Sequence, residues 1–204
     1  MAEILIIGGG AAGMAAAVFA AEAGHTVQVF ERNEKLGKKL FITGKGRCNF
    51  TNACEIEDLF ANVISNSKFL YSAFYGFTNE DAIGFFERLG VRTKVERGNR
   101  AFPASDHSSD IIRSMEQRMR DLGVKIHLNT RVSELLSKEQ KVYGILLEGV
   151  TKILGDRVIL ATGGCSYPVT GSDGDGYQMA KDLDIPVKTL RPALVPLVVK
   201  EDYI

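Results

Sequence analysis

The stretch MAEILIIGGGAAGMAAAVFAAEAGHTVQVFE, residues 1–31, predicts how this chain folds. Its apolar, branched run at residues 4–7 is typical of a buried parallel strand. An alanine-rich stretch at about residues 11–23, closed by Gly24, predicts a helix. Residues 26–30 then predict a second strand. Strand, helix and strand in this order indicate an α/β fold with a parallel sheet.

Three glycines between the first strand and the helix have the G-x-G-x-x-G spacing of dinucleotide-binding folds: Gly8, Gly10 and Gly13. Gly8 permits the tight turn, Gly10 lets a pyrophosphate approach the backbone, and Gly13 lets the helix pack closely on the strand. The N-terminal amides of the helix favour negative phosphates. Glu31, at the end of the second strand, can accept hydrogen bonds from ribose hydroxyls and would repel a 2′-phosphate. The stretch therefore predicts a dinucleotide-binding site.

This stretch also permits two other interpretations. Residues 4–21 form an uncharged run long enough to span a membrane. Four glycines, a preceding Glu3 and the lack of a basic flank disfavour a membrane anchor or a signal peptide. The other interpretation is a βαβ unit that binds no ligand, which the strand–turn–helix context with Glu31 in place disfavours.

The composition argues against several classes of partner and site. Of 204 residues, 45% are hydrophobic and 25% charged, and 25 basic residues balance 25 acidic ones. This balance does not indicate binding to nucleic acid or to an anionic membrane, so we expect a small-molecule substrate. The three cysteines, Cys48, Cys54 and Cys165, form no C-x-x-C pair, which fits a reducing cytoplasm. The three histidines are scattered, so we expect no metal site.

A glycine-rich basic segment, residues 32–54, begins directly after Glu31. It is not a P-loop, because Lys39 stands where the first glycine of that motif belongs and Gly46 follows Lys45. A solvated basic loop is one interpretation. We favour a ligand-facing loop, because glycines and small polar residues alternate with the charges and can present amides and cations to a phosphate or an electron-rich ring. Among its glycines stand Lys35, Lys38, Lys39, Lys45 and Arg47.

The middle of the chain predicts helices that alternate with short strands. Residues 55–90 contain apolar stripes at helical spacing, and we expect their aromatic side chains in the core. Thr78 and Asp81 resemble a capping box for a helix that ends at Gly90. The elements expected next are a strand at 91–95, a turn-rich loop at 97–110, and a helix capped by Ser108 or Ser109 that ends at Gly123.

The last third of the chain predicts strands around a second glycine-rich turn. Residues 156–160 are expected to form a parallel strand that runs into Ala161, Thr162, Gly163 and Gly164. The two glycines leave the backbone at this sheet edge without side chains, so a ligand can approach it. The alternative interpretation is an ordinary turn that ends the strand. The later acidic pair, Asp173 and Asp175, does not complete an EF-hand, because Tyr177 takes the third ligand position. The other expected elements are a parallel strand at 124–128, a β-meander at 131–136, 142–147 and 150–154, a helix at about 177–183, and an extended segment at 187–199.

Three segments together resemble one family: GGGAAGMAAA, LGKKLFITGKGRCNFTN and ILATGGCSYPVTGSDGDGY. With GNRAFPASD and RPALVPL in support, the chain is similar to the NAD(P)/FAD-dependent oxidoreductases of the BaiN and aminoacetone oxidase type, within the glutathione-reductase-like flavoproteins. The resemblance runs over essentially the whole chain. It implies an α/β, Rossmann-like FAD/NAD(P)-binding fold with a mostly parallel sheet and an added three-stranded β-meander.

The resemblance also implies which residues meet the FAD. The first glycine turn would hold the pyrophosphate, Glu31 the ribose, and the second glycine-rich turn would pass beside the cofactor. The basic segment would line the flavin side, and Val132 would meet adenine through its backbone. The residues implied are Gly8, Gly10, Ala11, Ala12, Gly13, Glu31, Arg32, Lys39, Thr43, Gly44, Gly46, Arg47, Cys48, Asn49, Val132, Ala161, Thr162, Gly163 and Gly164.

Proteins of this family usually continue beyond the RPALVPL block into a substrate-side domain, and then return with a strand and helix that close over the flavin. We therefore interpret residues 1–190 as an FAD-binding domain without its closing segment. Residues 191–204 are interpreted as the start of a linker to the substrate-side domain.

The function implied is that of an FAD-dependent oxidoreductase or its N-terminal part. The flavin would take a hydride from NAD(P)H or an organic donor and pass electrons to an acceptor that the sequence does not identify. A cation such as Lys45 or Arg47 near the ring would stabilise the reduced anion, and Cys48 is interpreted as a packing or flavin-contact residue. An NAD-binding dehydrogenase and an inactive nucleotide-binding fragment are the alternatives. No residue is indicated as a general base.

Overall fold

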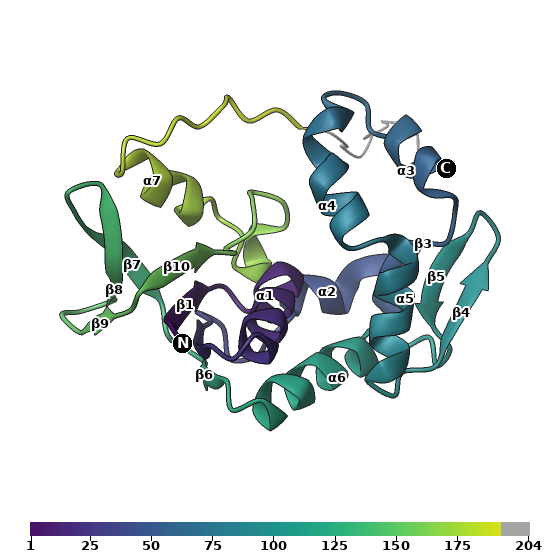
Figure 1. Cartoon of the computed structure of the whole chain (residues 1–204), viewed down its shortest axis with the longest axis horizontal. Helices are drawn as coiled ribbons and strands as arrows, with labels where there is room; N and C mark the ends of the chain where they lie inside the picture. Colours follow the sequence, from purple (N-terminus) through teal and green to yellow (C-terminus); the bar gives the residue numbers. More distant parts are fainter. Residues whose placement is uncertain (193–204) are drawn as a thin grey trace, which may run out of the picture.

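A four-stranded parallel sheet with the strand order β10–β1–β2–β6 lies at the centre of the fold (Figure 1). The structure is a computed structural model of the chain, and it describes residues 1–192. The four strands lie where the sequence predicts them, to within one or two residues. They are β1 (Glu3–Ile7), β2 (Thr26–Phe30), β6 (Lys125–His127) and β10 (Arg157–Leu160).

One face of the sheet is covered by two helices, α1 (Ala11–Glu22) and α6 (Ser108–Asp121). Ile4 and Ile6 of β1 point to this face, and they belong to one buried cluster with Met119 of α6 and apolar residues of α1 and β2. Each large apolar side chain buried in this way stabilises the fold by roughly 1.5–3 kcal/mol. This cluster fixes α1, and with it the first glycine turn, on the sheet.

The opposite face of the sheet packs against the β-meander. Leu5 and Ile7 alternate with the residues that face α1, and they join a second buried cluster with Ile145 and with Met179 of α7 (Asp175–Lys181). The predicted meander is therefore confirmed. Its antiparallel strands are β7 (Val132–Lys138), β8 (Lys141–Leu147) and β9 (Lys152–Leu154).

Between β2 and β6 the chain forms a separate group of short helices and a small antiparallel sheet, with the strand order β3–β5–β4 (Figure 1). The helices and strands of this group are α2 (Lys38–Ile42), β3 (Thr51–Asn52), α3 (Ile56–Ala61), α4 (Tyr71–Gly76), α5 (Asn79–Arg88), β4 (Thr93–Glu96) and β5 (Arg100–Pro103). Short 3₁₀ helices occupy Thr43–Gly46 and Ser67–Leu70 here, and Pro168–Thr170 after β10.

Two local predictions in this group are wrong. The segment expected to be a turn-rich loop contains β5, because four residues carry too weak a pattern to reveal their pairing with β4. Ser108 does not cap α6, and neither does Ser109: the N-cap residue is His107. The Ser108 hydroxyl instead donates to the carbonyl oxygen of Phe41 at 2.8 Å, which ties α6 to α2.

The capping box of α5 is confirmed. The Asp81 amide donates to the Thr78 hydroxyl at 3.1 Å, and the Thr78 amide donates back to the Asp81 carboxylate at 2.9 Å. The extended segment expected at 187–199 is only partly described. Residues 185–192 follow α7 without regular secondary structure, and residues 193–199 lie outside the described part of the chain.

The aromatic side chains of the segment 56–77 do not form the core that the sequence predicts. None of the residues of α3, α4 and the 3₁₀ helix between them is buried. Ile64 is fully exposed and Phe69 is 78% exposed. Helical spacing predicts which residues share a face, but not whether another element covers that face.

The first glycine turn is built from direct contacts between backbones. A Cβ atom at Gly13 would lie 1.8 Å from the carbonyl oxygen of Gly8, so only glycine lets α1 approach β1 this closely. Gly8 itself has φ +105°, and a Cβ there would lie 2.4 Å from the carbonyl oxygen of Ala161. Gly10 differs from both, because a Cβ there would meet nothing within 4 Å.

We predict that Gly13→Ala destabilises the chain by about 3 kcal/mol or prevents folding, because the new methyl group overlaps backbone that cannot move without separating α1 from β1. Urea unfolding followed by circular dichroism measures the change. Gly10→Ala is the matched control, and its loss should stay below about 1 kcal/mol because the site is open and only the N-cap changes. Equal stability of the two variants would contradict this account of the turn.

Candidate functional site

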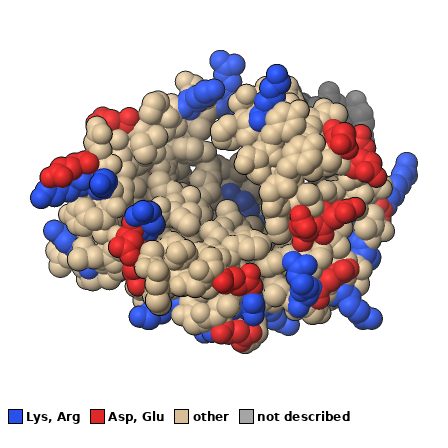
Figure 2. Space-filling view, viewed as in Figure 1, with Lys and Arg blue, Asp and Glu red and all other residues tan. Residues whose placement is uncertain are grey.

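A cavity of about 510 Å³ lies at the carboxyl ends of β1, β2 and β10, where open parallel sheets bind ligands. Figure 2 shows this face of the molecule hollowed between α7 and α4. The first glycine turn, the end of β2, α2, the start of the meander and the segment after β10 all contribute to its walls. The lining residues are Ile7, Gly8, Gly10, Ala11, Ala12, Phe30, Glu31, Arg32, Asn33, Gly37, Lys38, Lys39, Leu40, Thr43, Thr130, Arg131, Val132, Leu160, Ala161, Thr162, Gly163, Thr170, Gly171, Ser172, Asp175 and Met179.

The first glycine turn leaves space for a ligand at the N-terminus of α1. Gly10 is the N-cap residue of α1, and no side chain caps the helix there. The first amides of a helix have no partner within the helix and carry its positive dipole end. Since Gly10 also lines the cavity and has open space around its α-carbon, a phosphate can approach these amides without meeting a side chain.

Glu31 is the buried acid of the cavity, with 7% of its surface exposed. One carboxylate oxygen accepts a hydrogen bond from the Gly9 amide at 2.7 Å. The other accepts from the amide and the side-chain nitrogen of Asn33 at 2.9 and 2.6 Å. These contacts hold the carboxylate at the end of β2, beside the glycine turn.

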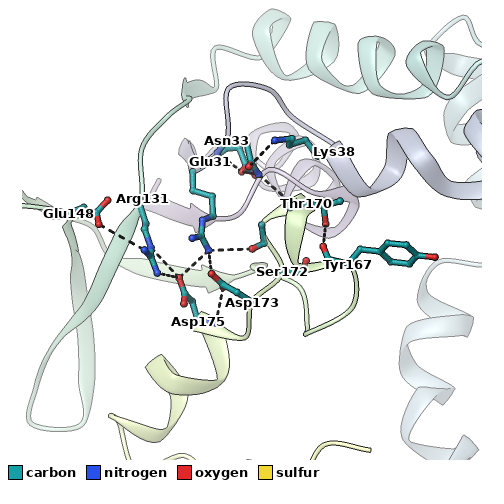
Figure 3. A network of polar contacts seen from close by, with 12 residues as sticks. Glu31, Asn33, Lys38, Arg131, Glu148, Tyr167, Thr170, Ser172, Asp173 and Asp175 are labelled. Carbon is teal, nitrogen blue, oxygen red and sulfur yellow. Dashed lines mark hydrogen bonds and ion pairs between the residues drawn. The ribbon is translucent and has the colours of Figure 1, made fainter. Parts of the chain in front are cut away.

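A segment that we call the strap, residues 167–175, closes one side of the cavity and is held by polar contacts (Figure 3). The Asn33 side chain donates to the carbonyl oxygen of Thr170 at 3.1 Å. The Lys39 ammonium donates to the Ser172 hydroxyl at 2.7 Å. Asn33 therefore contacts both the Glu31 carboxylate and the strap.

Two arginines pair with two carboxylates of the strap. Arg32 contacts Asp173 at 2.5 Å and Asp175 at 3.3 Å, and Arg131 contacts Asp175 at 2.8 Å. Burial raises the pKa of Asp173, but the hydrogen bond from Arg32, the backbone hydrogen bond from Asp175 and the charge of Arg32 together hold that pKa below its ordinary value. The hydrogen bond to Asp175 raises the pKa of Arg131. Two arginines thus face two aspartates, so the formal charges of the four groups balance.

The structure places many of the residues named from the sequence around this one cavity. These are Gly8, Gly10, Ala11, Ala12, Glu31, Arg32, Lys39, Thr43, Val132, Ala161, Thr162 and Gly163. The others do not line it: Gly13, Gly44, Gly46, Arg47, Cys48, Asn49 and Gly164. Contact of either set with a cofactor stays a prediction.

Two residues in the second set have clear contacts elsewhere. The Cys48 side chain is fully buried in a cluster with Val91 and Ile111, and this burial raises the pKa of its thiol. Cys48 is thus a packing residue. The Arg47 guanidinium contacts Glu96 and Asp106, and these hydrogen bonds raise its pKa.

Sequence reasoning missed the strap and its partners. Asp175 was considered only as a calcium ligand, yet it lines the cavity and pairs with both Arg32 and Arg131. Asn33, Thr130, Thr170, Gly171 and Ser172 also line the cavity, and none of them is among the site residues predicted from the sequence. The acidic pair after Gly171 was the available signal, because buried or half-buried carboxylates require cationic partners.

The described residues contain neither a metal-ligand cluster nor a membrane-spanning helix. Within residues 1–192 no three His, Cys, Asp or Glu side chains gather as ligands for a metal ion. Among the helices described in that range, none combines the length and apolar character needed to span a bilayer.

Comparison with known proteins identifies a matching family and several relatives. The model of the HI0933-like protein Rossmann domain matches residues 2–191. The chain is 38% identical over 203 residues to a 3-dehydro-bile acid delta(4,6)-reductase of Clostridium scindens, covering 98% of this chain and 48% of that protein. It is 34% identical over 202 residues to a ribosomal RNA dihydrouridine synthase of Haemophilus influenzae, covering 98% and 49%. The chain spans about half the length of the curated relatives it matches.

Among solved structures, the chain resembles the 3-ketosteroid-delta4-(5alpha)-dehydrogenase of Rhodococcus jostii RHA1. The TM-score is 0.71 at 17% sequence identity, and the match covers 89% of this chain and 53% of that one. At this identity the likeness concerns the fold alone.

We predict that Asp175→Asn lowers the free energy of unfolding by about 0.5–1 kcal/mol at neutral pH, because it removes two partly exposed ion pairs that hold the strap. The denaturant midpoint measures this loss. Glu148→Gln is the matched control, since Glu148 faces the same Arg131 at 3.9 Å and is 71% exposed. We expect no measurable change for the control, and an equal loss in both variants would show that Asp175 does not hold the strap.

Proposed function

Because the chain belongs to the HI0933-like Rossmann domain family, we propose that its cavity binds FAD and that the chain is the flavin-binding part of an oxidoreductase. The observation that carries this proposal is the open glycine turn beside a buried, fixed Glu31. A Cβ at Gly10 would occupy space that nothing else in the described chain fills. The residues present therefore fit a dinucleotide.

Different residues of the chain would bind different parts of FAD. The amides at the N-terminus of α1 would bind the pyrophosphate, and Glu31 would accept hydrogen bonds from the ribose. The backbone at Ala161–Gly163 and the side chain of Lys39 line the same cavity and would bind the remainder. FAD itself supplies the hydride and electron transfer, so the protein's part is to position the cofactor and shield it from water.

The wider context of the reaction is also part of the proposal. We expect NAD(P)H or an organic molecule as the electron donor, an acceptor that is not identified, and a small-molecule substrate, with no nucleic acid or membrane as partner. The relatives' names give different substrates, so the proposal stops at the class of reaction. Three free cysteines are consistent with a cytoplasmic site of action. Residues 1–190 are proposed as the FAD domain and residues 191–204 as the start of a linker.

The test is the visible absorption spectrum of the purified chain, before and after incubation with FAD and removal of the free cofactor. We expect a bound flavin spectrum, and release by heat should identify the bound molecule as FAD. Gly10→Val should still fold, with a loss of stability similar to that of Gly10→Ala, because a Cβ there meets nothing within 4 Å. It should lose FAD affinity by about 100-fold or more, since a side chain there blocks the pyrophosphate.

A chain that stays colourless and binds NADH at the same turn would contradict the proposal and support the NAD-binding alternative. Equal FAD binding by wild type and Gly10→Val would show that the flavin lies elsewhere. For a chain that binds FAD, anaerobic mixing with NADH or NADPH identifies the donor by the loss of flavin colour.

A further inference from the structure

The loop at residues 43–49, which we call the α2 loop, has an unusual backbone. Four of its residues have φ between 57° and 86°: Gly44, Lys45, Gly46 and Cys48. Glycine adopts this left-handed region freely, but Lys45 and Cys48 carry a Cβ that makes it unfavourable. A non-glycine residue stays in this conformation only where the surrounding structure holds it there.

One end of the α2 loop is held by packing. The Cys48 side chain is fully buried, and its amide donates to the carbonyl oxygen of Thr43 at 3.0 Å. The Asn49 side chain donates to the carbonyl oxygens of Thr51 and Ala101 at 2.9 and 3.0 Å. These contacts fix the residues after the turn but leave Lys45 exposed.

The other attachment is a group of four charges that we call the charge square: Arg47, Lys94, Glu96 and Asp106. Arg47 contacts Glu96 and donates to Asp106 at 2.7 Å, while Lys94 contacts the same two carboxylates at 3.2 and 2.6 Å. The Arg47 guanidinium also lies over the ring of Phe102 at 4.3 Å. Since Glu96 and Phe102 belong to β4 and β5, the square fastens the α2 loop to that hairpin.

The charge square lies behind the cavity wall, not within it. Thr43, the first residue of the α2 loop, lines the cavity, as does Lys39 of α2. No member of the square lines it. The two carboxylates balance the charges of Arg47 and Lys94, so the square presents no net charge toward a ligand.

We propose that Arg47 is a positioning residue: through the charge square it holds the strained α2 loop, and hence the cavity wall at Thr43, in its ligand-binding shape before the ligand arrives. This inference rests on the proposed function, from which we take FAD as the ligand that meets this wall. A wall that is already ordered costs the ligand less on binding, because no loop has to be fixed at that moment. This positioning role requires no contact between Arg47 and the flavin ring, and the electrostatic role suggested by the sequence stays a separate prediction.

The first experiment needs no ligand. Hydrogen–deuterium exchange is measured on the wild type and on the double variant Glu96→Gln/Asp106→Asn, which removes the charges but preserves size. We expect exchange of the amides at 44–49 to become about tenfold faster while α1 is unchanged, because only the local opening is affected. Glu22→Gln, which breaks a distant surface pair with Arg118, is the control and should leave the α2 loop as it is. Unchanged exchange at 44–49 in the double variant would overturn the proposal.

The second experiment separates positioning from general stability. Affinity is measured for FAD and for ADP, a probe that has the adenine, ribose and pyrophosphate of FAD but lacks its flavin. The double variant should lose FAD affinity by about fivefold and keep its ADP affinity, because only the α2 wall is loosened. Equal losses for both probes would overturn the proposal in favour of a merely structural role.

Arg47→Lys completes the test, because lysine keeps the positive charge but cannot reproduce the hydrogen-bond geometry by which the guanidinium binds both carboxylates. It should behave like the double variant, and wild-type FAD affinity in this variant would overturn the proposal. A wild-type chain that binds ADP but no FAD would refute the proposed function alone, since the exchange experiment reports on the α2 loop without any ligand.

Discussion

The closeness of two backbones is the constraint on which the rest of this structure depends. A Cβ at residue 13 would lie 1.8 Å from the Gly8 carbonyl oxygen, so α1 rests on the end of β1 without a side chain between them. The same turn contacts the end of β10 at Ala161. These contacts bring three strand ends, the N-terminus of α1 and Glu31 to one place, and the cavity follows from that arrangement.

Around this rigid turn, the walls of the cavity are held by ion pairs together with hydrogen bonds and the packing of Cys48. The strap is attached through Arg32, Arg131 and two aspartates, and the α2 loop through the charge square. A single partly exposed ion pair contributes little, but each of these carboxylates has more than one cationic contact or shares its partner, so the loss of one contact does not free the segment. In both groups the formal charges of the arginines, the lysine and the carboxylates balance, so they order the walls without adding net charge to them.

The sheet and the glycine turn could be predicted because their signals are local. A branched apolar run, three spaced glycines and an acid at the end of the second strand each require a particular backbone. The strap could not be predicted in the same way, because Arg32 and Asp173 lie 141 residues apart. No local sequence pattern near either residue indicates that the two form an ion pair. The prediction that the aromatic side chains of α3 and α4 are buried is wrong for a related reason. Their spacing is helical, but burial depends on which elements pack against them.

The difference between a core held by apolar packing and walls held largely by polar contacts has a thermodynamic consequence. Leu5, Ile6 and Met14 are fully buried, so the turn beneath the cavity opens only when the sheet itself unfolds. The strap and the α2 loop contain left-handed residues that carry side chains, Tyr167, Lys45 and Cys48, and these need outside contacts to persist. A ligand that touches both the strap and the α2 loop adds such contacts. By thermodynamic linkage, the free energy by which the ligand stabilises the ordered walls equals the free energy by which ordered walls favour binding of the ligand. Cavity order and ligand affinity are thus two measurements of one equilibrium.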